Sequence, residues 1–439
     1  MDTPGSQTTQ YDEARRALSH WRQRTLALLW LIYASFYLCR VNLASAQRSL
    51  CARQGLSKRQ LGWILAAMKT LYAAGQFING ALADRFGPRR LIVTGLIGSA
   101  ALNMLFAHLH QFGGMAITWA LNGYFQACGW TPVVRIIANW FPSRLRDAAS
   151  GIIGTSYILG SGLSWLLAGR LTDAYGWRYA FWVPAWVCMA MVVVVLGAVK
   201  SKTDEVGLSG IDEDTMASAP GPSEGCPTWR WVLASPRLWM LAAANCALIY
   251  GSHGLLDWTP HYLAEVQQST AGAAAAQAFV MPLGGAVGCL VVTFVARRAP
   301  GRLDYRPVVA CVLALAFLTW LFPLVAESAA GAVPVALFLL GACSSGPASL
   351  MACAMPANIA TSRGAGTAAG LVDASAYVGS ALSGWSSGRI IDHVAARRGQ
   401  MAAWRTVWRV WPIGMLLAAL LLAGCLARAE REGRTRAEP

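Results

Sequence analysis

Three polar side chains in an apolar stretch near the N-terminus have the spacing of an anion-binding site. The stretch LIYASFYLCRVNLA, residues 31–44, contains Tyr33, Tyr37 and Arg40 at positions i, i+4 and i+7. In a helix this spacing puts all three side chains on one face. A guanidinium group can bind phosphate, phosphonate or carboxylate through two parallel hydrogen bonds, and phenols can donate further ones.

Two more apolar stretches carry buried polar groups of the same kind. In LGWILAAMKTLYAAGQFINGALA, Lys69, Tyr72 and Gln76 follow one another along one helical face, and GTAAGLVDASAYVGSALSG contains Asp373. We expect a cationic cavity in which Arg40 and Lys69 face a small anion, with the tyrosines and Gln76 donating hydrogen bonds. Asp373 is either a coupling acid, whose protonation frees a cation for the ligand, or a structural partner of Lys69. Arg40 has its own structural alternative, in which it reaches out to the membrane interface.

The composition indicates that lipid surrounds most of these elements. Hydrophobic residues make up 56% of the 439 positions, charged residues only 13%, and the mean hydropathy is +0.43. Apolar blocks of about twenty residues recur along the chain, each long enough to cross the ~30 Å core of a bilayer. We therefore predict an all-α membrane protein with twelve transmembrane helices. The expected spans are 26–46, 60–83, 91–110, 114–137, 147–170, 177–199, 234–262, 272–296, 307–326, 333–356, 364–390 and 404–427.

The basic residues predict the orientation of these spans. Most arginines and lysines fall in alternate loops and in both terminal segments, which indicates cytoplasmic termini. The net charge of +15 is then a signal of topology and of contact with anionic lipid. We expect no nucleic-acid partner. The composition, rich in Ala and Arg, favours a bacterial inner membrane.

The chain divides into two related halves. A polar stretch rich in Gly, Ser and Pro predicts a flexible cytoplasmic linker over 200–233, after an N-terminal segment 1–25 and a first bundle 26–199. The second bundle is 234–427, followed by a tail 428–439. The halves align without gaps in one stretch, GSGLSWLLAGRLTD (160–173) with GSALSGWSSGRIID (379–392), at a constant offset of 219 positions. Two six-helix pseudo-repeats of this kind place a binding site between them, near the bilayer midplane.

Enzymatic chemistry is not expected. The eleven cysteines lack metal-ligand spacing and most lie within spans, where they pack as small apolar residues. Nucleophile–base patterns and phosphate-cradling loops are also missing from the sequence, so we predict neither cofactor nor metal.

The loop after the second span resembles a known family signature. GALADRFGPRR, residues 80–90, is similar to the G-x-L-A-D-R-x-G-x-R-R motif of the major facilitator superfamily. The resemblance implies the major facilitator fold. It also implies a gating role for Asp84, Arg85, Arg89 and Arg90, which could latch the cytoplasmic face through ion pairs.

Other stretches resemble one branch of that superfamily, the organophosphate:phosphate antiporters. The most specific is NGYFQACGWTPVVRIIANWFP, residues 122–142, and YASFYLCRVN, LLDWTPHYL and GAGTAAG are similar as well. The family binds phosphate with one arginine from each half. The resemblance places Arg40 on the first arginine and Tyr33, Tyr37 and Tyr72 on site tyrosines. The second arginine is replaced by Ser252 beside His253, a lysine by Gln76, and a histidine by Tyr157.

The expected function is secondary active transport of a small organic anion by alternating access. An organophosphate or phosphonate, exchanged against inorganic phosphate, is the leading substrate. One alternative is a proton-coupled carrier of another solute that uses Asp373. A second alternative is a membrane sensor that binds a phosphorylated ligand without transporting it.

Overall fold

The computed structural model describes residues 4–208, 232–296 and 306–435, and the backbone in these ranges forms helices and no strand. The first half contains α1 (Pro4–Leu38), α2 (Asn42–Gln54), α3 (Lys58–Phe86), α4 (Pro88–His108), α5 (Phe112–Gln126), α6 (Trp130–Trp140), α7 (Ser143–Tyr175), α8 (Tyr179–Ala198) and the short η1 (Thr203–Val206). The second half contains α10 (Pro236–Val266), α11 (Ala271–Ala278), α12 (Val280–Ala296), α13 (Arg306–Ser328), η3 (Ala330–Ala332), α14 (Val333–Ser349), the π-helical η4 (Leu350–Ala354), α15 (Met355–Arg398) and α16 (Gln400–Thr435).

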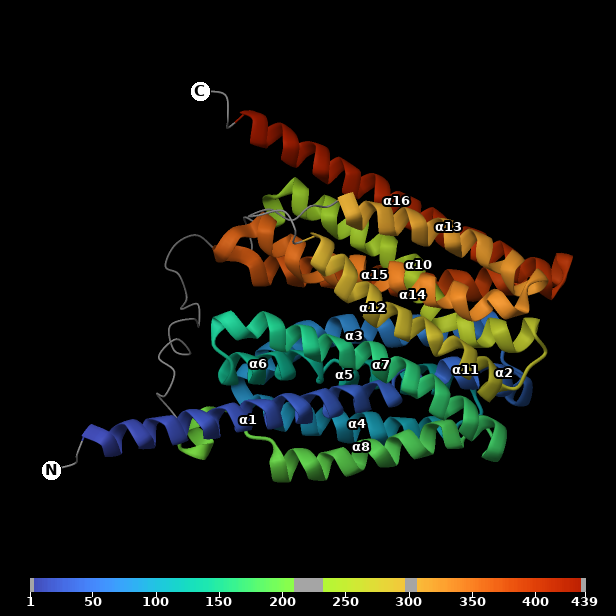
Figure 1. Ribbon diagram of the computed structural model, residues 1–439. Helices are drawn as coiled ribbons and strands as arrows, with labels where there is room; N and C mark the ends of the chain where they lie inside the picture. The colour runs from blue at the N-terminus through green and yellow to red at the C-terminus, as the bar shows by residue number, and fades with distance from the viewer. Residues whose placement is uncertain (1–3, 209–231, 297–305, 436–439) are drawn as a thin grey trace.

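The long helices run side by side, and those of each half group together (Figure 1). Helices α1–α8 occupy one half of the molecule and α10–α16 the other. The halves meet where α3 packs on α15, where α7 packs on α11 and α12, and where α2 packs on α10. Both termini lie at the same end of the bundle, as an even number of crossings requires (Figure 1).

The all-helical prediction is confirmed, although several predicted spans are built from two helices. Eight stretches of the described residues are long and apolar enough to cross a membrane by composition alone. The fourth predicted span divides into α5 and α6, both short. Helices α3, α10 and α15 fall outside the eight stretches and carry the internal charges Lys69, Asp257 and Asp373. In these three helices the internal charges and other polar residues lower the mean hydropathy of the span.

The first span is interrupted at residues 39–41, between α1 and α2. A helix break leaves carbonyl groups without their usual partners, and in an apolar interior these must be satisfied. Buried amides from neighbouring helices do so: Asn103 and Asn122 donate to the Cys39 carbonyl over 3.1 and 2.9 Å, and Gln126 donates to that of Phe36. Arg40 lies within this break. The cation therefore sits on a backbone segment whose free carbonyl groups accept hydrogen bonds from neighbouring helices.

The glycines of the sequence repeat mark close helix approaches, one equivalent pair within the halves and one between them. Gly160 lies against the backbone of Ala34 in α1, and its counterpart Gly379 lies against Cys246 in α10. A Cβ on Gly169 would lie 2.7 Å from the Ala271 carbonyl oxygen. A Cβ on its counterpart Gly388 would overlap the Lys58 carbonyl oxygen, at the contact of α15 with α3. The matched glycines therefore permit equivalent close approaches.

The repeat also supplies two equivalent aspartates that cap helices of the opposite half. Asp173, at the end of α7, accepts hydrogen bonds from the Ala271 and Gly272 amides at the start of α11, over 3.0 and 2.8 Å. Asp392, near the end of α15, accepts from the Lys58 and Arg59 amides at the start of α3, over 3.1 and 2.7 Å. A carboxylate at a helix N-terminus satisfies free amides and complements the helix dipole.

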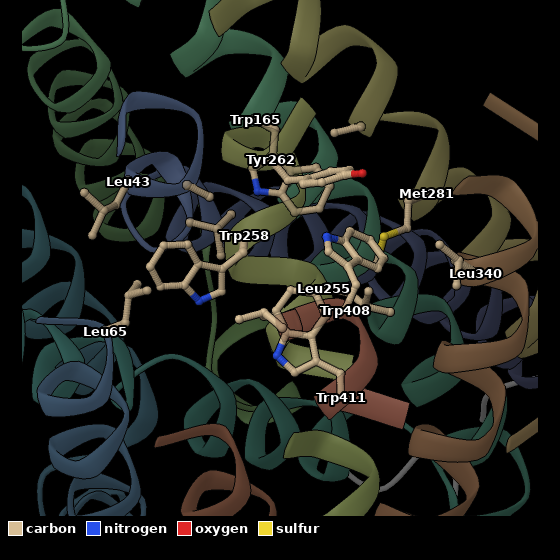
Figure 2. Close-up of a cluster of buried hydrophobic side chains, with 14 of the residues drawn as sticks. Leu43, Leu65, Trp165, Leu255, Trp258, Tyr262, Met281, Leu340, Trp408 and Trp411 are labelled. Atoms are coloured by element: carbon tan, nitrogen blue, oxygen red, sulfur yellow. The ribbon is translucent and has the colours of Figure 1, made fainter. Parts of the chain in front are cut away.

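Further contacts close the halves at the same end, which is opposite to the termini. The amide of Gln47 donates to the Asp257 carbonyl over 3.0 Å, and Arg48 donates to that of Ser269 over 2.8 Å. Lys58 forms an ion pair with Glu265 at 2.6 Å. A hydrophobic cluster fills the space below these contacts and includes side chains from both halves, among them Leu43, Leu65, Trp165, Trp258 and Tyr262 (Figure 2).

The close backbone contacts at Gly169 and Gly388 predict the effect of adding a single methyl group at either position. Gly388→Ala and Gly169→Ala should prevent full closure at this end, because the new Cβ meets backbone of the other half. We expect slower substrate uptake in proteoliposomes and reduced cross-linking between cysteines introduced on the two halves there.

Matched controls lie on the same helices. Gly370 on α15 and Gly151 on α7 have open space where a Cβ would sit. Alanine at either position should leave uptake unchanged and favour the helix by about 1 kcal/mol. Equal uptake by Gly388→Ala and Gly370→Ala would show that the close approach is not needed.

Candidate functional site between the two halves

Arg40 lies at the helix break with its guanidinium among aromatic rings. Its Cζ lies 4.0 Å from the ring centroid of Tyr72 and 4.9 Å from that of Tyr37, and it donates to the Tyr37 hydroxyl over 3.2 Å. Within the described ranges, no carboxylate lies within 4.0 Å of the Arg40 guanidinium, the distance of an ion pair. Rings stabilise the cation through their faces but leave most of its N–H groups free to bind an anion.

A belt of tyrosines from both halves surrounds this cation. Tyr33 packs edge-on against Tyr37 with centroids 5.6 Å apart, and Tyr37 lies 6.1 Å from Tyr157. Tyr377, from α15, packs on Tyr72 at 4.5 Å. The predicted grouping of Tyr33, Tyr37, Tyr72 and Arg40 is thus present, and Tyr377 joins it from the second half.

Lys69 has a partner that the sequence analysis did not assign. Its ammonium forms an ion pair with the carboxylate of Asp257, on α10, and both side chains are 9% exposed. The expectation that Lys69 is an uncompensated cation is therefore wrong, and so is its alternative pairing with Asp373. Asp257 of the second half pairs with Lys69. Of the two predicted cations, Arg40 is therefore the one without a carboxylate partner in the described part of the chain.

Gln76, Tyr157, Ser252 and His253 occupy different surroundings. Gln76 donates to the Tyr72 hydroxyl over 2.8 Å and accepts from Thr131. The Tyr157 hydroxyl lies 3.2 Å from that of Ser349 on α14, so it bridges the halves. His253 Nδ1 lies 2.5 Å from the Ser380 hydroxyl, whereas the buried Ser252 hydroxyl has no partner among the described residues.

Asp373 lies on α15, one helical turn before Tyr377, and is half-buried. Its carboxylate makes neither a hydrogen bond nor an ion pair with the described residues. The charged group whose field reaches it is Arg40. Asp373 is thus connected to Arg40 through two aromatic rings, Tyr377 on its own helix and Tyr72, without touching it.

The predicted gating residues lie at the end of the bundle that holds the termini. Arg89 donates to the Val195 carbonyl over 3.2 Å, which ties this loop to α8, while Arg85 lies 5.5 Å from the ring of Phe86 and is exposed, as is Arg90. The side chain of Asp84 lies outside the described residues. The latch that the motif implies stays a prediction.

Two residues of this group were missed by the sequence analysis. Asp257 lies inside the quoted stretch LLDWTPHYL and Tyr377 follows Asp373 by four positions. An acid within an apolar span is itself a signal, which could have identified Asp257. Its pairing with Lys69 could not have been read from the sequence, because 188 positions separate them.

A cavity in the described part of the chain lies away from these residues. It measures about 360 Å³ and is lined by Arg59, Gln60, Trp63, Phe112, Trp385 and Arg389. None of the predicted site residues lines it, and Trp63 is half-exposed on the outer surface. Among the described residues no cluster of His, Cys, Asp or Glu could hold a metal ion.

Helical halves that close over buried charges define a polytopic membrane transporter. The chain belongs to the Major Facilitator Superfamily, whose model matches residues 29–384. The predicted fold class of twelve transmembrane helices in two pseudo-repeats, and the absence of an enzymatic role, agree with this membership.

The relatives confirm the predicted resemblance to organophosphate:phosphate antiporters. The chain is 26% identical over 397 residues to a probable hexose phosphate transport protein of Chlamydia pneumoniae, covering 86% of this chain and 87% of that protein. It is 28% identical over 414 residues to the glycerol-3-phosphate transporter of Bacillus subtilis, covering 89% and 91%. It is also 26% identical over 429 residues to the membrane sensor protein UhpC of Salmonella typhimurium, covering 94% and 93%.

Solved structures share the fold at lower identity. A bacterial homologue of the human lysosomal transporter Spinster, in an inward-facing and occupied conformation, superposes with a TM-score of 0.72 at 15% identity and covers 93% of this chain and 97% of that one. The nucleoside transporter NupG gives a TM-score of 0.69 at 12% identity, covering 92% and 99%.

The buried ion pair predicts strongly non-additive mutational effects. Asp257→Asn leaves the Lys69 ammonium buried without its partner, which typically costs about 3–5 kcal/mol. The double variant Lys69→Gln/Asp257→Asn removes both charges and should recover most of that loss. Thermal unfolding in detergent measures both effects.

An exposed ion pair serves as the control. Arg405 and Glu327 pair at the outer end of the second half, and Arg405 is largely exposed. Glu327→Gln should shift the unfolding temperature far less than Asp257→Asn. Additive losses in the Lys69/Asp257 double variant would contradict a paired role.

Proposed function

We propose that this protein transports a small organic anion by alternating access, with an organophosphate or phosphonate as substrate and inorganic phosphate as exchange partner. The carrying observation is Arg40: a permanent cation at a helix break, ringed by tyrosines from both halves and without a carboxylate partner in the described chain. An arginine fork suits these anions better than an ammonium does. Hexose phosphate and glycerol 3-phosphate are the cargo named for relatives.

The proposed binding group is the Arg40 cluster with its neighbours. Tyr33, Tyr37, Tyr72 and Gln76 supply hydrogen-bond donors from the first half, and Tyr157 supplies another beside α14. Ser252 and His253 belong to the second-half wall, where His253 contacts Ser380. Lys69 takes part through exchange of partners: an incoming anion competes with Asp257 for the ammonium, which loosens a contact between the halves.

The closed end of the molecule supports the alternating-access step. Asp173, Asp392, Gln47, Arg48 and Lys58 hold the halves together opposite the termini. We propose that both termini are cytoplasmic and that the membrane is the bacterial inner membrane. The closed end then lies on the outer side, and the conformation is inward-facing. The loop residues Asp84, Arg85, Arg89 and Arg90 would then close the opposite end. Six-helix units over 26–199 and 234–427, joined through 200–233, would move as bodies. The 209–231 part of that linker lies outside the described residues.

Two other functions have specific support. The free carboxylate of Asp373 near Arg40 suits a proton-coupled carrier, since protonation would change the charge of the site. Similarity to a membrane sensor protein suits ligand binding without flux. Uptake into proteoliposomes separates the three: exchange without a pH gradient supports the antiporter, gradient-driven uptake supports proton coupling, and binding without flux supports a sensor.

Arg40→Lys tests the binding role directly. Lysine keeps the charge but loses the planar fork, so exchange of radiolabelled phosphate should fall about tenfold or more. Arg53→Lys, at an exposed position on α2, should leave exchange unchanged. Normal exchange by Arg40→Lys would remove this residue from the site.

A further inference from the structure

The charges of the central site are divided between the halves. The first half contributes two cations, Arg40 and Lys69, and the second half contributes two carboxylates, Asp257 and Asp373. These four groups sum to zero net charge. A dianion entering this region would therefore bring uncompensated charge into a low-dielectric interior, which is costly.

Only one of the two possible pairs is formed. Lys69 and Asp257 neutralise each other. Arg40 and Asp373 make no ion pair, although Arg40 contacts Tyr72, and Tyr72 packs on Tyr377, one turn from Asp373. Neither has a partner of opposite charge among the described residues. Buried charges are ordinarily paired, so an unpaired acid and base facing one region indicate a ligand that completes both.

The aromatic groups connect these two charges. Tyr72 contacts the Arg40 guanidinium with its ring, and Tyr377 packs on Tyr72 at 4.5 Å, one turn from Asp373. Aromatic faces beside a carboxylate are the surroundings in which proteins bind ammonium groups. The arrangement thus offers an anion-binding end at Arg40 and an ammonium-binding end at Asp373.

We propose that the substrate is zwitterionic: a phosphate ester or phosphonate that also carries an amine, with its anionic group on Arg40 and its ammonium on Asp373. This rests on the proposed function and specifies its substrate class. Asp373 is then a specificity residue, because it selects for the amine and adds nothing to the binding of a simple anion.

A matched pair of ligands tests this. 2-Aminoethylphosphonate and n-propylphosphonate differ by an ammonium in place of a methyl group. The wild-type protein in detergent should bind the amine-bearing compound about tenfold more tightly, the value of one charge-assisted hydrogen bond. In Asp373→Asn the two affinities should become equal, through weaker binding of 2-aminoethylphosphonate with that of n-propylphosphonate retained. Glu327→Gln, at the outer surface, should keep the tenfold preference.

The outcomes separate this inference from the function on which it rests. Equal binding of both compounds by the wild type would overturn the zwitterion alone, and so would an Asp373→Asn variant that keeps the preference. If Asp373→Asn lost affinity for both ligands equally, Asp373 would have a role in folding instead. If the variant kept the preference but its binding no longer depended on pH, Asp373 would have a role in proton coupling instead. If the wild type binds neither compound nor inorganic phosphate, the proposed function falls with it.

Discussion

The buried ion pair between Lys69 and Asp257 is the interaction on which the rest of the structure depends. It joins the two halves near their centre, where neither charge could remain alone without a cost of several kcal/mol. The pair therefore holds α3 and α10 in register across the interface. It also leaves Arg40 and Asp373 as the two charges of the site that a ligand can contact without first displacing an ion-pair partner.

At the closed end, equivalent residues of the duplicated sequence form equivalent contacts between the halves. Gly169 and Gly388 permit backbone contact, and Asp173 and Asp392 cap helices of the opposite half. These caps are hydrogen bonds to backbone amides, whose formation does not depend on side chains of the partner helix. Such contacts can form and break as the halves rock, with little rearrangement inside each half.

The positions at which this sequence departs from the organophosphate:phosphate antiporter pattern change the charge of the site. Where a second arginine is expected, Ser252 is neutral and its hydroxyl lacks a partner among the described residues. The loss of that cation, together with Asp373, lowers the positive charge available to a substrate. Relatives that carry the names of hexose phosphate and glycerol-3-phosphate transporters belong with this chain to one superfamily, and the charge balance of the site is the basis for the zwitterionic substrate proposed above.

The sequence by itself determined the helical membrane class, the duplication and the Arg40 face, because hydropathy, repeat offset and i, i+4, i+7 spacing are local or periodic properties. It also placed Lys69 and Asp373 inside spans. Only the tertiary structure decided that Lys69 pairs with Asp257, that Tyr377 completes the aromatic belt, and that the first span breaks at Arg40. Those features depend on helices distant in sequence. Their packing chooses which carboxylate reaches a buried cation and which carbonyls Asn103, Asn122 and Gln126 can satisfy.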